Sequence, residues 1–127
     1  MTDPAPDPPR ATAGDAGALR AERTAVLARL ARLREEHAAF VAASRDSNAD
    51  DEHDPEGATI AFERAQVETL LREGEERLRD IDAALARVTR GEYGACAVCG
   101  RPIDPARLAV RPSATTCVPC ASPSRRR

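Results

Sequence analysis

Residues 58–90 read ATIAFERAQVETLLREGEERLRDIDAALARVTR, and larger apolar side chains recur along them at alternating gaps of three and four. This heptad spacing places those side chains on one stripe of an α-helix. The same alternation runs through residues 16–46. Two such stripes predict two long helices that pack along a shared seam. The first stripe contains Leu19, Arg23, Val26, Leu30, Leu33, His37, Phe40 and Ser44. The second contains Ile60, Arg64, Val67, Leu71, Gly74, Leu78, Ile81, Leu85 and Val88.

A polar connector separates the two stripes. It contains six acidic and no basic residues, and we expect Pro55 and Gly57 to break the helix there. A polar turn reverses the chain, so the helices should be antiparallel, with an acidic tip at 46–57. Pairing residues whose numbers sum to 104 gives every apolar layer a partner. This register sets Gly74 opposite Leu30, so that a large side chain faces a residue without one. A slip of seven residues preserves the heptad pattern as well, and the choice between the two registers rests on the loop length.

The composition also favours a narrow seam over a thick core. The 127 residues include 26 Ala, two Phe, one Tyr and no Trp. A compact domain of this length needs more apolar bulk to offset its chain entropy. We expect a disordered Pro-rich tail at 1–15, where four of the ten Pro lie, and a disordered basic tail at 122–127.

Four cysteines form two Cys-x2-Cys pairs, Cys96 with Cys99 and Cys117 with Cys120, separated by 17 residues. This spacing is typical of a structural zinc site, in which four thiolates surround one Zn²⁺ and leave no position for a reactive water. Two disulfides are disfavoured because we find no secretory signal. A redox-active cysteine pair is also disfavoured, because it normally accompanies a strand and helix pattern that this sequence lacks. The apolar side chains of 91–121 are too few for folding without metal.

The sequence therefore predicts a mainly α protein. We expect a long antiparallel two-helix coiled-coil hairpin at 16–90, followed by a small C-terminal C4 zinc-finger module at 91–121. No catalytic constellation or Gly-rich phosphate loop accompanies these elements, which argues against an enzyme. No apolar run reaches the roughly 18 residues of a membrane span, so we expect a cytoplasmic protein without membrane contact. The hairpin satisfies its own seam, which favours a monomer.

The zinc-finger segment resembles a known signature. GEYGACAVCGRPIDPARLAVRPSATTCVPCA, residues 91–121, is similar to the C4 zinc finger of the DksA/TraR family. DPEGATIAFERAQ, residues 54–66, resembles the start of the second helix in family members of high-G+C Gram-positive bacteria. The shared features of the finger are the YG before the first Cys, the CG after the first pair, Ile103, Arg107-Leu108, Arg111-Pro112 and Ala114.

This resemblance implies a bacterial transcription regulator that binds RNA polymerase itself and not a DNA sequence. In the family, an acidic coiled-coil tip enters the secondary channel of the polymerase, and a tip pattern D-x-x-D-x-A modulates initiation. Asp51 and Asp54 supply the two acids here, while Glu56 stands at the Ala position.

The resemblance also bears on the alarmone ppGpp, the signal of the stringent response. Responsive family members place basic residues at two positions that are Asp80 and Ala121 in this chain, together with an Arg that matches Arg111. The resemblance therefore implies that Arg111 contacts an anion. Because the other two cations are missing, we expect ppGpp potentiation to be weak or absent.

Two other functions are compatible with the sequence. One is a weak, nonspecific nucleic-acid-binding zinc ribbon, for which the charge is unfavourable. Residues 91–127 carry six Arg and two acids, a charge of +4, and four thiolates on Zn²⁺ lower this to about +2. The other is a coiled-coil adaptor whose zinc knob docks another protein. A salt titration on nucleic-acid probes separates the first of these from a polymerase-binding factor.

Overall fold

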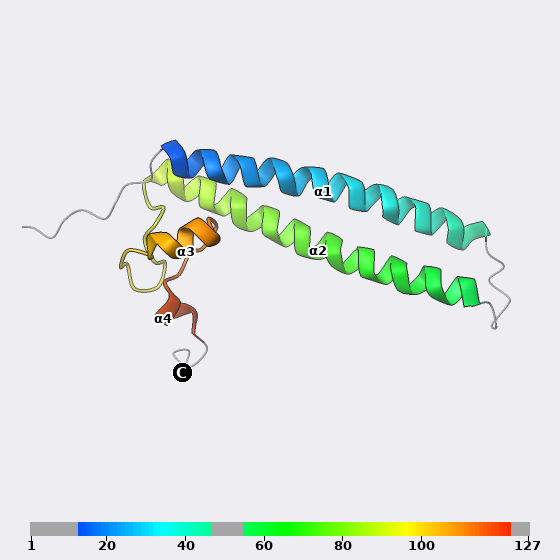
Figure 1. The fold of residues 1–127 in the computed structure, drawn as a ribbon. Helices are drawn as coiled ribbons and strands as arrows, with labels where there is room; N and C mark the ends of the chain where they lie inside the picture. The colour runs from blue at the N-terminus through cyan, green and yellow to red at the C-terminus, as the bar shows by residue number, and fades with distance from the viewer. Residues whose placement is uncertain (1–12, 47–54, 123–127) are drawn as a thin grey trace, which may run out of the picture. The chain divides into compact units, whose positions relative to one another are not determined.

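Helices dominate the computed structural model, which describes residues 13–46 and 55–122. No strand occurs in these ranges, and a β-bridge joins Ala95 to Pro102. None of the described helices has the length and apolarity needed to cross a membrane. The prediction of a mainly α fold, with two long helices and a C-terminal four-cysteine cluster, is confirmed. The helices are α1 (Ala13–Asp46), α2 (Pro55–Arg90), α3 (Pro105–Val110) and α4 (Val118–Ala121) (Figure 1).

Both long helices begin earlier than the sequence pattern indicated. α1 begins at Ala13, and α2 begins at Pro55, with Gly57 inside its first turn. The prediction that Pro55 and Gly57 interrupt the helix is therefore wrong. Proline suits the first helical position because the N–H that it lacks would have no partner within the helix. The Thr59 hydroxyl donates to the Pro55 carbonyl oxygen at 3.0 Å.

The chain forms two compact units, each with its own length of α1 and α2. Among the described residues, one unit combines 13–23 with 79–122, and the other comprises 24–78. The side chains of Leu19 and Ile81 are fully buried in the first unit. The side chain of Leu30 is fully buried in the second. Since all three belong to the predicted stripes, the heptad pattern correctly identified the seam.

The predicted register is confirmed at Gly74. A Cβ atom built on this glycine would lie 2.7 Å from Cδ2 of Leu30 on α1. Such a separation is well inside van der Waals contact for two carbon atoms. The two helices therefore approach closely at this point, and only a residue without a side chain fits there unless Leu30 moves.

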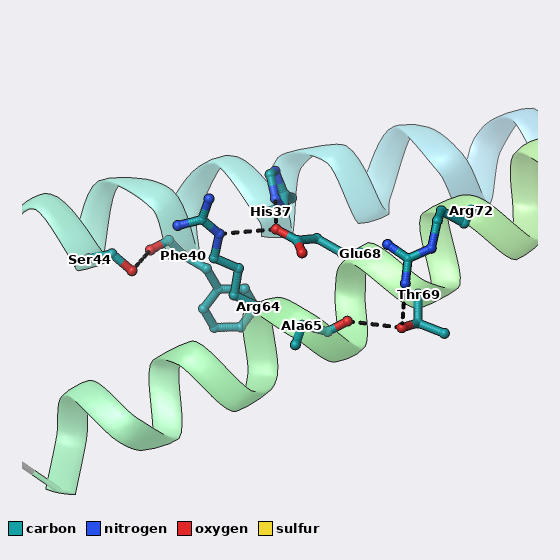
Figure 2. A network of polar contacts seen from close by, with 8 residues as sticks. All are labelled: His37, Phe40, Ser44, Arg64, Ala65, Glu68, Thr69 and Arg72. Carbon is teal, nitrogen blue, oxygen red and sulfur yellow. Dashed lines mark hydrogen bonds and ion pairs between the residues drawn. The ribbon is translucent and has the colours of Figure 1, made fainter.

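The polar positions of the seam have acidic partners on α2. His37 Nε2 lies 3.0 Å from Glu68 Oε1, and Arg64 Nε donates to the same oxygen at 3.1 Å (Figure 2). Hydrogen bonds from His37 and then Arg64 lower the pKa of the Glu68 carboxyl. In the other unit, Arg23 Nε donates to Asp82 Oδ1 at 2.7 Å. Polar groups at these seam positions are thus paired across the two helices.

Candidate metal centre

The first Cys-x2-Cys knuckle lies in the turn that follows α2. The Cys96 N–H donates to the Arg101 carbonyl oxygen at 2.8 Å, and the Gly100 N–H donates to the Cys96 carbonyl oxygen at 2.9 Å. Gly100 has a φ of 75°, in the left-handed region that favours glycine. This residue closes the tight turn that brings the Cys99 side chain back beside that of Cys96.

The second knuckle lies at the start of α4. Cys117 precedes the first residue of α4, and its carbonyl oxygen accepts a hydrogen bond from the Ala121 N–H at 3.0 Å. Pro119 lies in the first turn, where its missing N–H leaves no gap in the helical bonding. The first knuckle is tied to the segment just before the second, because the Ala97 N–H donates to the Thr115 carbonyl oxygen at 2.8 Å.

The four sulfur atoms come together. The thiol groups of Cys96, Cys99, Cys117 and Cys120 all lie within 4.8 Å of one another. Cys99 Sγ and Cys117 Sγ are 3.7 Å apart, which is too long for a disulfide and close to the edge of about 3.8 Å that tetrahedral Zn–S bonds of about 2.3 Å produce. The cluster therefore fits one zinc ion, with every position filled by sulfur.

The knuckle backbones favour negative charge on one of the sulfurs. Hydrogen bonds from the backbone of Cys99 and then of Cys117 lower the pKa of the Cys96 thiol to about 6. A hydrogen bond with the Cys117 side chain, followed by burial, raises the pKa of the Cys120 thiol to about 12. Zinc binds thiolates, so its binding releases the protons that the cluster still holds and weakens as the pH falls.

A small group of buried side chains supports the knuckles. Tyr93, Ile103 and Ala114 are buried, and the Tyr93 hydroxyl donates to the Pro112 carbonyl oxygen at 2.7 Å. The side chain of Asp104 accepts from the Ala106 N–H and caps α3. This core is small for a module of about 30 residues, so its stability depends on the metal.

A polar cavity of about 210 Å³ opens beside the module. Asp80, Arg111 and Ala121, the three positions that the sequence singled out for anion binding, all line it. Arg107 lines it too, although its guanidinium already donates to the Thr116 carbonyl oxygen at 2.9 Å. The Asp80 carboxylate thus faces the same cavity as the Arg107 and Arg111 guanidiniums, and its negative charge reduces the attraction of the cavity for phosphate.

Four further residues bear on the predicted sites, two that the sequence proposed and two that it did not. Asp51 and Asp54, the expected tip pair, lie outside the described residues. Arg87 and Arg107 were not singled out by the sequence for a role at the zinc site, yet both donate to backbone carbonyl groups beside the cysteine knuckles. Arg107 belongs to the Arg107-Leu108 pair of the finger signature, which gave it no particular role, and Arg87, nine residues before Cys96, gave no signal distinguishable from the chain's many other arginines.

Comparison with known proteins agrees with this geometry. Residues 91–126 match the family model of the prokaryotic dksA/traR C4-type zinc finger. The structure of transcription factor DksA2 from Pseudomonas aeruginosa superposes with a TM-score of 0.71 and 31% sequence identity, covering 84% of this chain and 76% of that one. The chain belongs to the DksA/TraR family. Its four-cysteine cluster is accordingly the family's C4 zinc finger.

Two further relatives of this DksA/TraR protein come from Bacillus subtilis (strain 168). The uncharacterized protein YteA is 39% identical over 66 residues, which cover 52% of this chain and 28% of YteA. The uncharacterized protein YlyA is 39% identical over 56 residues, which cover 44% of this chain and 45% of YlyA. The chain therefore spans less than half the length of these two curated relatives.

Proposed function

We propose that this chain is a transcription regulator that binds RNA polymerase directly. Its acidic tip would enter the secondary channel and modulate initiation there. The observation that carries the proposal is the likeness to DksA2, a transcription factor, over 84% of this chain. Family membership supports a regulatory role and not an enzymatic one. The protein would bind the polymerase in the cytoplasm, and it would do so as a monomer.

In this proposal the zinc finger is structural. Cys96, Cys99, Cys117 and Cys120 would hold one Zn²⁺, whose contribution is to fix the module's fold. The clustering of their sulfur atoms within 4.8 Å supports this assignment. Sequence-specific DNA binding is not part of the proposal, because a module of about +2 charge offers little attraction to phosphate.

The tip acids are assigned the regulatory step. Asp51 and Asp54 would act at the polymerase, while Glu56, exposed in the first turn of α2, adds a third carboxylate. We further propose that ppGpp has a weak effect or none. Support comes from the cavity beside the finger, where Asp80 and Ala121 accompany Arg111 in place of a fuller set of cations.

The test is binding of the zinc-loaded protein to core RNA polymerase from a related bacterium. We expect a known secondary-channel protein to compete it away. An Asp51→Asn, Asp54→Asn double variant should still bind but should lose its effect in an initiation assay. An Asp3→Asn, Asp7→Asn double variant removes the same charge outside the hairpin and should behave as the parent.

The contrary outcomes are distinct. No polymerase binding at micromolar concentration would reject the proposal and favour a protein adaptor. Submicromolar binding to nucleic-acid probes that disappears with added salt would instead favour a zinc ribbon that contacts phosphate. Binding without loss of effect in the tip variant would reject the assignment of Asp51 and Asp54 alone.

A further inference from the structure

Each cysteine knuckle is preceded by a carbonyl group that an arginine holds. Arg87 Nη2, from the last turn of α2, donates to the Ala95 carbonyl oxygen at 2.6 Å. Arg107 Nε, from α3, donates to the Thr116 carbonyl oxygen at 2.9 Å. Ala95 comes directly before Cys96, and Thr116 comes directly before Cys117. The same contact thus occurs at the same point of both Cys-x2-Cys pairs.

From these contacts we propose that Arg87 and Arg107 are positioning residues for the zinc site. The proposal rests on the four cysteines as zinc ligands and not on any contact with polymerase. Neither arginine would touch the metal. Each would set the direction in which the first sulfur of its knuckle points and would supply positive charge to the metal centre.

Peptide planarity explains how a carbonyl contact can orient a cysteine. The Ala95 carbonyl and the Cys96 N–H belong to one rigid peptide unit. Arg87 holds the carbonyl end of this unit, and the Arg101 carbonyl oxygen accepts from its N–H end at 2.8 Å. A peptide plane held at both ends leaves the Cys96 Cα, and therefore its side chain, little freedom to turn away from the other sulfurs.

Arg87 also connects the first knuckle to the end of α2. Its Nη2 makes a second hydrogen bond, to the Glu92 carbonyl oxygen at 3.2 Å, and its own carbonyl accepts from the Glu92 N–H at 2.9 Å. The turn between the helix and the knuckle is therefore attached to one residue at three points. A guanidinium suits this task because its several N–H groups form a fixed planar fork.

Charge gives a second reason for two arginines. Four thiolates on Zn²⁺ leave a net charge of −2 in a module with little water around its buried Cys96. Arg87 and Arg107 are each half-buried, and together they carry +2. Partners beyond the ligands of a metal site commonly contribute about 10- to 100-fold to its affinity.

The experiment compares zinc affinity by chelator competition in the full chain. We expect Arg87→Met and Arg107→Met each to weaken zinc binding about tenfold or more. Arg87→Lys should recover part of the loss because an ammonium can replace one hydrogen bond. With Co²⁺ in place of zinc, the absorption bands of a tetrahedral four-sulfur site should be weaker or shifted in the Met variants.

Two matched controls are available in the same region. Arg90 lies one turn from Arg87 and pairs with the Glu92 carboxylate at 3.1 Å, with more than half of both side chains exposed. Arg101 lies two residues after Cys99, and its side chain is exposed. Arg90→Met and Arg101→Met remove the same charge without releasing either carbonyl, so they should change zinc affinity less than twofold.

Three results would overturn the proposal. The first is Met variants at 87 and 107 that bind zinc within twofold of the parent. The second is lower helix stability in those variants with unchanged zinc affinity and unchanged Co²⁺ spectra, which would mean a merely structural role. The third is an equal loss in the Arg90 control, which would mean that overall charge sets the affinity. None of them depends on whether the chain binds polymerase.

Discussion

Leu30 occupies the space that Gly74 leaves open on the facing helix. Leu30 is fully buried, and a Cβ on residue 74 would lie 2.7 Å from its Cδ2 atom. Because the two residues sit where the heptad register places them, a single glycine on α2 marks the alignment of the helices within this unit. A large side chain against a gap cannot shift by a turn without meeting another layer.

Replacing Gly74 with Ala should lower the free energy of unfolding by about 1 kcal/mol. Ala favours helix by about 1 kcal/mol over Gly, but overpacking a tight seam costs about 1–3 kcal/mol. Gly17, also inside a helix, has nothing within 4 Å of an added Cβ, so Gly17→Ala should stabilise by about 0.5–1 kcal/mol. Urea unfolding followed by circular dichroism measures both.

A double-mutant cycle isolates the contact itself. In a Leu30→Ala background the obstacle is gone, so Gly74→Ala should become neutral or stabilising there. Equal effects of Gly74→Ala in both backgrounds would show that Leu30 does not limit the approach of the helices.

The Glu68 network should make stability depend on acid. Hydrogen bonds to His37 and Arg64 lower the pKa of Glu68 in the folded chain below its ordinary value of 4.5. The unfolded carboxyl then binds protons first, so stability is fully present above about pH 4.5 and falls as the pH drops through the folded pKa. Glu68→Gln should flatten that part of the unfolding profile, measured by urea titrations between pH 2.5 and 6.

A control on the same helix separates this effect from general acid unfolding. Glu76 is exposed on α2, and Glu76→Gln should leave the slope of the profile unchanged. A slope in Glu68→Gln equal to that of the parent would show that the network does not contribute to the pH dependence.

Zinc removal should unfold the finger and spare most of the helices. The unit comprising 24–78 contains none of the cysteines, whereas Tyr93, the sole tyrosine of a chain without Trp, is buried beside them. Chelation should therefore change tyrosine fluorescence strongly and reduce the helical circular-dichroism signal only slightly. A Cys96→Ser variant should resemble the chelated parent, and a complete loss of helix on chelation would contradict this account.

Restoring positive charge around the cavity should restore an alarmone response. We expect an Asp80→Lys, Ala121→Lys double variant to bind ppGpp on the order of 100-fold more tightly in complex with polymerase, since each of the two new charged hydrogen bonds contributes on the order of 1.5 kcal/mol. Glu76→Lys changes the charge by +2, compared with +3 in the double variant, at a residue that does not line the cavity, and should have no effect. An unchanged affinity in the double variant would show that these two positions do not face the alarmone.

Sequence reasoning predicted the features that depend on spacing. Heptads indicated the helices and the contact between Leu30 and Gly74, and the two Cys-x2-Cys pairs indicated the sulfur cluster. It misjudged Pro55 because the residue reads as a breaker inside a helix but as a favourable start at its first position. It named Arg107 only as part of the finger signature and could not predict the contacts of Arg87 and Arg107, because their partners are backbone carbonyl groups, which look alike at every position of a sequence.

Two side-chain hydrogen bonds between α1 and α2 differ in the length of chain that they close. His37 and Glu68 are 31 residues apart, while Arg23 and Asp82 are 59 apart. Closing the longer loop directly costs about 0.6 kcal/mol more in chain entropy, and the partner of Arg23 also leaves the ribosome later. We expect the two helices to zip together from the 37/68 pair toward the 23/82 pair during synthesis. The first turns of α1 belong to the unit that contains the zinc finger, so we expect this unit to assemble only after the finger has been translated.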